Sequence, residues 1–163
     1  MPDVRTDWTL EEVHALPDNG SRYELIDGEL LVTPAPSGVH QRCLQPLTLL
    51  LQPFGERLGI EVLQAPYSVR LPGGGEVQPD LVAFPRGHHV VPPDFSEVRD
   101  LILAVEVVSA TSARADRFRK RQLYLSAGIP EYWIVDLGNR LIGTVDAARR
   151  RTGGGPDDDR LGA

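Results

Sequence analysis

Three residues of this sequence have types and settings that favour hydrolytic chemistry on a phosphate. Asp80 lies in the strand-like segment VQPDLVAF, and Glu106 is the sole charged residue of the apolar segment LILAVEVV. Lys120 is the only lysine in a chain that has 16 arginines. Two carboxylates can hold Mg²⁺ through oxygen, and a lysine can orient a water molecule or stabilise negative charge on a reacting phosphate.

Each of these residues also has a purely structural interpretation. Glu106 could form a buried salt bridge with an arginine of the following helix, because a carboxylate in an apolar strand is costly when it is unpaired. Asp80 could begin a strand or occupy a bulge, capping a loose backbone N–H. Lys120 could pair with Asp116, one helical turn earlier, on an exposed surface. The residues alone leave these alternatives open.

The spacing between Glu106 and Lys120 allows the two side chains to meet. Glu106 lies three residues before the expected strand end at Ser109, which is about 10 Å along a strand. Lys120 lies eight residues into a helix that begins near Ser112, which is about 12 Å along the helix axis. If the helix folds back against the strand, both residues reach a similar depth. Tyr124 follows Lys120 by one turn on the same helical face.

Hydrophobic periodicity and turn signals predict the elements that must position these residues. We expect a short helix between Thr9 and Pro17, a hairpin over residues 22–33, a helix over 39–58, and strands over 60–65, 67–71 and 76–84. These elements are followed by a loop over 87–97, a buried strand over 101–108, a helix over about 112–127, a strand over 131–136 and a weak strand over 137–145. This order predicts an α/β fold with a single mixed sheet and helices on both of its faces.

Two of these elements carry specific expectations. A two-residue turn at Asp27-Gly28 pairs Ile26 with Glu29 across the hairpin. The face of the hairpin that is expected to pack in the core then carries Tyr23, Leu25, Leu30 and Val32. The other face carries Glu24, Ile26, Glu29 and Leu31. In the long helix, Pro46 and Pro53 predict a kink or a break.

Composition narrows the class of protein. The chain has 163 residues, which is the size of one domain. Its formal net charge of −6 differs from the positive net charge that is typical of proteins that bind DNA non-specifically. Cys43 is the only cysteine, so disulfides within the chain and cysteine-based zinc sites are excluded. We expect a cytoplasmic protein without a signal peptide or membrane helix. Residues 1–146 are expected to form the domain, and 147–163 a low-complexity, disordered tail.

Four segments together resemble a known family. YELIDGEL, His40, VQPDLV and the long block from AVEVV to EYWIVD are similar to the Uma2 (Uma-two) family of restriction-endonuclease-like proteins. The resemblance covers about residues 23–136. It implies the PD-(D/E)XK nuclease fold, a mixed central sheet flanked by helices, here with an N-terminal β-hairpin. Asp80 and Glu106 match its metal-binding acids. The usual lysine two residues after the glutamate is replaced here by Val108, and Lys120 matches a helical lysine of the family.

The resemblance also suggests supporting residues. Glu24 and Glu29 match acids of the family, and we expect one of them, Glu29 by preference, to complete the metal shell; solvated strand residues are the alternative. His40 matches a family histidine, and two roles are open for it here: a cap or loop anchor at the start of the long helix, or a phosphate or base contact. Ser109 and Tyr124 are further candidate donors to the site.

The function that follows from this resemblance is a Mg²⁺- or Mn²⁺-dependent endonuclease that hydrolyses DNA as a homodimer. The alternative is a catalytically inactive protein of the same fold that binds nucleic acid or protein; an inactive mobile-element or toxin remnant is a third possibility. Members of the family continue past EYWIVD with further β structure, whereas this chain offers one weak strand. We therefore expect an incomplete sheet edge, with lower stability or activity.

Overall fold

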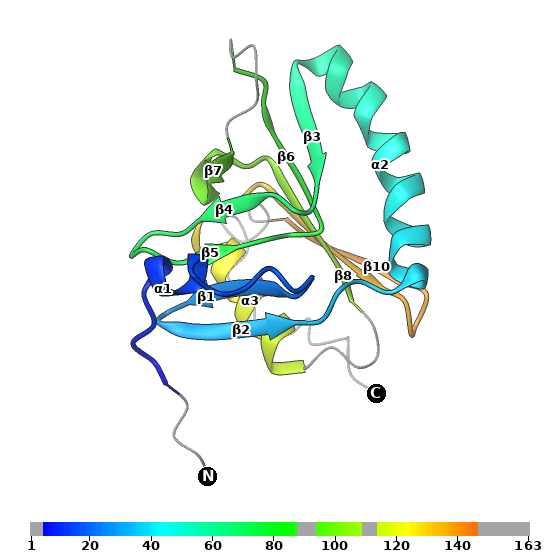
Figure 1. Ribbon diagram of the computed structural model, residues 1–163. Helices are drawn as coiled ribbons and strands as arrows, with labels where there is room; N and C mark the ends of the chain where they lie inside the picture. Colours follow the sequence, from blue (N-terminus) through cyan, green and yellow to red (C-terminus); the bar gives the residue numbers. More distant parts are fainter. Residues whose placement is uncertain (1–4, 88–93, 109–113, 147–163) are drawn as a thin grey trace, which may run out of the picture.

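The computed structural model describes residues 5–87, 94–108 and 114–146, which form two five-stranded mixed sheets flanked by helices (Figure 1). The first sheet has the order β2 (Glu29–Thr33), β1 (Arg22–Ile26), β5 (Glu76–Val77), β4 (Ser68–Arg70) and β7 (Phe95–Glu97). The second has the order β10 (Leu141–Asp146), β9 (Glu131–Asp136), β8 (Leu103–Val108), β6 (Leu81–Pro85) and β3 (Ile60–Gln64). The helices are α1 (Leu10–His14), α2 (Gly38–Leu58), the 3-10 turn η1 (Val98–Asp100) and α3 (Arg114–Ser126).

The second sheet is covered on both faces, as the apolar segment around Glu106 predicts. Every residue of β8 is buried, and this strand lies between β6 and β9. On one face, Leu44 of α2 packs with Val105 and Val107. On the other face, α3 and the first sheet share a core that contains Tyr124 and Val77. The mixed α/β class is confirmed, but the expected single layer is in fact two sheets.

The strand expected over residues 76–84 is divided between the two sheets. β5 pairs with β1 and β4 in the first sheet, whereas β6 pairs with β3 and β8 in the second. Gln78, Pro79 and Asp80 connect them, and proline cannot donate to a strand ladder. The chain therefore leaves one sheet at Pro79 and enters the other directly after Asp80.

The hairpin has the predicted register but the opposite buried face. Ile26 pairs with Glu29 around the Asp27-Gly28 turn, as expected. Val32, however, is 55% exposed, while Ile26 is buried in the core that the two sheets share. The prediction of faces was wrong because the first sheet turns its Glu24 and Ile26 side toward the second sheet. Helix α1 packs against β1, so Leu25 is buried as well.

Helix α2 is continuous through both of its prolines, so of the predicted kink or break the break does not occur. Both Pro46 and Pro53 are exposed, so each backbone carbonyl that loses its helical donor is on the side of the helix that water reaches. Leu44 is buried against the second sheet, but Phe54 and Leu58 at the far end are exposed. Part of the apolar stripe of this helix therefore packs against the second sheet, and the rest is exposed.

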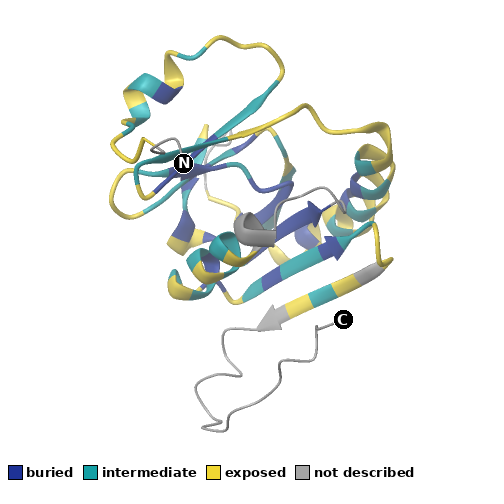
Figure 2. Ribbon diagram, turned by 90° about the horizontal axis from the view of Figure 1, so that it is seen from below, coloured by how far each residue is buried: buried dark blue, intermediate teal, exposed yellow. Residues whose placement is uncertain are grey.

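Both expected C-terminal strands are present, although the second begins at Leu141 rather than at residue 137, because residues 137–140 form the turn between them. β9 has the expected bounds, and β10 adds the weak strand as an antiparallel partner at the sheet edge, where Ile142 is exposed (Figure 2). Ser109 and residues 147–163 lie outside the described residues. None of the described helices is long and apolar enough to cross a membrane.

Candidate active site

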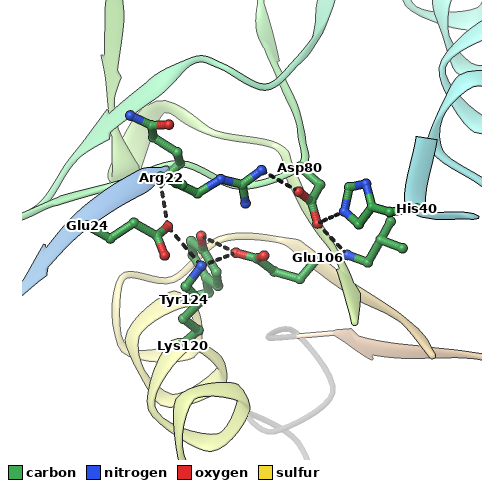
Figure 3. Close-up of polar contacts among 9 residues, drawn as sticks. Arg22, Glu24, His40, Asp80, Glu106, Lys120 and Tyr124 are labelled. Carbon is green, nitrogen blue, oxygen red and sulfur yellow. Dashed lines mark hydrogen bonds and ion pairs between the residues drawn. The ribbon is translucent and has the colours of Figure 1, made fainter. Parts of the chain in front are cut away.

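A cluster of charged and polar side chains lies where the two sheets meet, between the start of α2 and the side of α3 (Figure 3). β1, α2 and β8 each supply part of it, α3 supplies two residues, and the connection before β6 supplies another. The members are Arg22, Glu24, His40, Asp80, Glu106, Lys120 and Tyr124. Residues from distant parts of the sequence are thus brought together by the packing of one sheet on the other.

Lys120 links the two sheets electrostatically. Its Nζ donates to Glu106 Oε1 at 3.0 Å and to Glu24 Oε1 at 2.8 Å. Burial would lower the pKa of Lys120, but these two carboxylates raise it above its ordinary value, so the ammonium stays charged. The estimated equal depth of Lys120 and Glu106 therefore agrees with the structure. The side chain of Asp116, the alternative partner, lies outside the described part of the chain.

Asp80 is held by three N–H donors. Its Oδ1 accepts from Arg22 Nη2 at 2.8 Å, and its Oδ2 accepts from the backbone N–H of Val107 at 2.7 Å. His40 Nε2 lies 3.1 Å from Oδ2. Burial would raise the pKa of Asp80, but His40, Arg22 and the Val107 N–H hold it below its ordinary value. The ionised Asp80 carboxylate thus lies against the backbone of the residue that follows Glu106.

Burial is the main influence on the carboxyl group of Glu106. Burial raises the pKa of Glu106 to about 7, against the opposing charge of Lys120. The carboxylates of Asp80 and Glu24 act in the same direction as burial. Tyr124 donates its hydroxyl to Glu106 Oε1 at 3.2 Å. Near neutral pH this carboxyl group therefore retains a proton for much of the time, and another positive charge in the site would remove it.

The donor chemistry of this cluster fits a hydrated divalent cation. Asp80 and Glu106 offer carboxylate oxygens from the neighbouring β6 and β8 region. No group of three or more His, Cys, Asp or Glu residues is placed to hold a metal ion within the described ranges. Mg²⁺ commonly keeps several waters and needs only one or two carboxylates, so two acids suffice for it.

The structure separates the two acids of the hairpin. Glu24 is buried in the cluster, where Oε1 accepts from Lys120 and from the backbone N–H of Gln78 at 2.7 Å. Glu29 instead accepts from Arg119 Nη1 at 2.6 Å and is partly exposed. The expected preference for Glu29 as a metal ligand is therefore not supported by this geometry, and Glu24 is the hairpin acid that lies beside Lys120.

Sequence reasoning missed Arg22. Side chains two residues apart on a strand point to the same face, so Arg22 must face the same way as Glu24. The sequence therefore contained an indication of this position, but the prediction assigned the wrong face of the hairpin to the core. With the faces corrected, Arg22 enters the site directly beside Asp80.

Replacing Glu106 with glutamine should remove a pH dependence of stability. The pKa of Glu106 is about 7 in the folded protein against an ordinary value of 4.5, so the folded state holds an extra proton between these pH values. Without metal, wild-type stability should therefore fall by on the order of a few kcal/mol as pH rises from about 5 to about 7, and then level off. The E106Q protein has no such proton to lose.

Thermal denaturation in EDTA across this pH range measures the effect. The difference between wild type and E106Q isolates Glu106, and E56Q, which changes an exposed glutamate of α2, serves as the control. We expect E56Q to follow wild type. Parallel curves for wild type and E106Q would show that Glu106 ionises normally.

Comparisons with known proteins concern the fold and the family of this chain. The structure is similar to a crystal structure described as a putative nuclease belonging to DUF820 from Anabaena variabilis ATCC 29413, with a TM-score of 0.68. The two chains are 15% identical over 85% of this chain and 84% of that one, a likeness that shows the shared fold. No curated protein matches the sequence. The Uma2 family, described as "Putative restriction endonuclease", matches residues 10–152, and the chain therefore belongs to the Uma2 family.

Proposed function

We propose that this protein is a divalent-metal-dependent nuclease that hydrolyses phosphodiester bonds in DNA. Family membership supports a nuclease function. The observation that carries the proposal is the contact of Lys120 with Glu106, 3.0 Å apart and next to the backbone position that holds Asp80. Two acids, one directly before β6 and one in the neighbouring β8, with one buried ammonium are the groups that metal-assisted phosphodiester hydrolysis requires.

Asp80 and Glu106 would hold Mg²⁺ or Mn²⁺, which lowers the pKa of a bound water and offsets charge on the phosphate. The chain's own residues position the remaining parts. Lys120 is charged and has three N–H donors, two of which are directed at Glu24 and Glu106. The third can donate to the attacking water or to a phosphate oxygen. Tyr124 and Glu24 restrict how Glu106 and Lys120 move during the reaction.

Plasmid nicking by the purified wild-type protein tests the proposal. We expect supercoiled plasmid to be converted to open-circular and linear forms with Mg²⁺ or Mn²⁺ and to persist in EDTA. E106Q prepared in parallel should give no products, which controls for a contaminating nuclease. A wild-type protein that neither cleaves plasmid nor changes its melting temperature with either metal contradicts the proposal. We also expect a homodimer, which would place two such sites on one duplex.

A catalytically inactive nucleic-acid-binding or protein-binding role is the second candidate. It is favoured by the closed character of the cluster, because both Asp80 oxygens and the Lys120 ammonium already have protein partners. Such a network could serve only to hold the two sheets together. In that case Mg²⁺ should leave the melting temperature of wild type unchanged.

A further inference from the structure

Arg22 is a second cation within the candidate active site. It is the first residue of β1, its side chain is 15% exposed, and Nη2 donates to Asp80 Oδ1 at 2.8 Å. Burial alone would lower the pKa of Arg22, but Asp80 and the two other carboxylates of the site raise it. The guanidinium therefore remains charged and lies within electrostatic reach of all three acids.

The charges of the site suggest why this arginine is present. Glu24, Asp80 and Glu106 contribute three negative charges when ionised, whereas Arg22 and Lys120 contribute two positive ones. One divalent cation would turn this single negative excess into a single positive excess. That charge matches one phosphodiester group. Without Arg22, the site with one bound divalent cation would have no net charge and would not attract an anionic substrate.

The two cations differ in how firmly they are held. Lys120 donates to two buried carboxylates, one on each sheet. Arg22 has five N–H donors, and within the described residues its side chain makes its hydrogen bond to Asp80 alone. A cation bound at Asp80 would compete with Arg22 for the same carboxylate. The planar guanidinium could then present its paired donors to phosphate oxygens, a geometry that suits arginine better than lysine.

We propose that Arg22 binds the phosphodiester of the substrate: it neutralises Asp80 when no divalent cation is bound, and it turns to a phosphate oxygen when a cation takes its place at Asp80. This assignment rests on the proposed nuclease function. It differs from a purely structural role for Arg22, in which the guanidinium only offsets the charge of Asp80 and has no part in binding DNA.

Two binding measurements separate these roles, with Ca²⁺ as a divalent probe that prefers oxygen ligands. Calorimetry measures Ca²⁺ affinity, and fluorescence anisotropy measures the affinity for a short fluorescein-labelled duplex in the presence of Ca²⁺. We expect R22Q to bind Ca²⁺ about tenfold more tightly, because the competing cation is gone, and to bind DNA about tenfold more weakly. The two effects have opposite signs, which a simple loss of folding cannot produce.

The matched control is R86Q, which removes another arginine that is ion-paired to a carboxylate, Glu61, at 3.1 Å. It should leave both affinities as in wild type. R22K keeps the charge at Asp80 and therefore the fold, but it lacks the planar fork, so its DNA affinity should lie between those of wild type and R22Q.

Tighter Ca²⁺ binding with unchanged DNA affinity in R22Q would overturn the proposal and leave Arg22 as a counter-ion of Asp80. If R22Q proves unstable in thermal denaturation, R22K carries the test, and a DNA affinity of R22K equal to that of wild type would overturn the proposal. If wild type itself binds neither Ca²⁺ nor DNA, the proposed nuclease function fails first, and the assignment of Arg22 fails with it.

Discussion

Cleavage of plasmid DNA should fall by about a hundred- to a thousandfold when Lys120 is replaced with alanine, the loss typical of removing one preorganised donor from an active site. The ammonium of Lys120 is the only described cation bonded to Glu106, at 3.0 Å. Its loss removes a donor to the reacting groups and also raises the pKa of Glu106 further, because Lys120 opposes that rise. The rate of loss of supercoiled plasmid with Mg²⁺ measures the combined effect.

A compact ammonium is required at this position rather than any positive charge. One nitrogen atom lies 2.8 Å from Glu24 Oε1 and 3.0 Å from Glu106 Oε1, in a side chain that is only 12% exposed. A longer, planar guanidinium cannot place a single nitrogen between both oxygens without moving the helix. K120R should therefore cleave as poorly as K120A.

The R99A protein, which changes an exposed arginine, provides the control for lost positive charge and should cleave at the wild-type rate. Cleavage by K120R above about a tenth of the wild-type rate would contradict the need for an ammonium. Cleavage by K120A at the wild-type rate would remove Lys120 from the mechanism altogether.

Replacing Asp80 with asparagine should abolish the response of the protein to divalent metal. The side-chain amide of D80N keeps the shape of the carboxylate but not its charge, so the rise in melting temperature that we expect Mg²⁺ to cause in wild type should be absent. The same change leaves Arg22 without its carboxylate partner, and breaking a largely buried pair costs about 3 kcal/mol. Thermal denaturation with a Mg²⁺ titration, and urea unfolding without metal, measure the two effects separately.

The E29Q protein is the informative control for Asp80. Glu29 lies against Arg119, so E29Q should keep the full metal-induced rise in melting temperature. If E29Q loses that rise, Glu29 is a metal ligand, as the family resemblance suggested. If D80N keeps it, the divalent cation does not bind at this cluster.

Local patterns in the sequence were sufficient for the half of the site that is built on the second sheet. The uniformly apolar segment around Glu106 predicts a central strand, and β8 is buried throughout. The rise per residue of a strand and of a helix then gives the depth at which Lys120 meets Glu106, and their contact agrees with that estimate. These inferences need only neighbouring elements, because α3 follows β8 directly.

The other half depends on contacts that no local pattern contains. Nothing in the alternation of the hairpin says which of its faces another sheet will cover, and both faces of β1 are in fact buried at Leu25 and Ile26. The division of one apparent strand into β5 and β6 likewise depends on two sheets forming, with Pro79 as the only local indication. The place of Arg22 and the choice between Glu24 and Glu29 therefore depended on which face of the hairpin the second sheet covers.

The crossing of the chain at Gln78, Pro79 and Asp80 has a consequence for when the protein can act. Gln78 donates its backbone N–H to Glu24, so the crossing peptide fastens the hairpin to the acids of the second sheet. If the first sheet separates from the second, Asp80, Glu106 and Lys120 stay with the second sheet. Arg22 and Glu24 remain on the first sheet and leave the site. Partly folded molecules, as during synthesis or mild heating, would thus lack the complete constellation. Under the proposed function, such a molecule would keep Asp80, Glu106 and Lys120 together but would lack the phosphate contact assigned to Arg22.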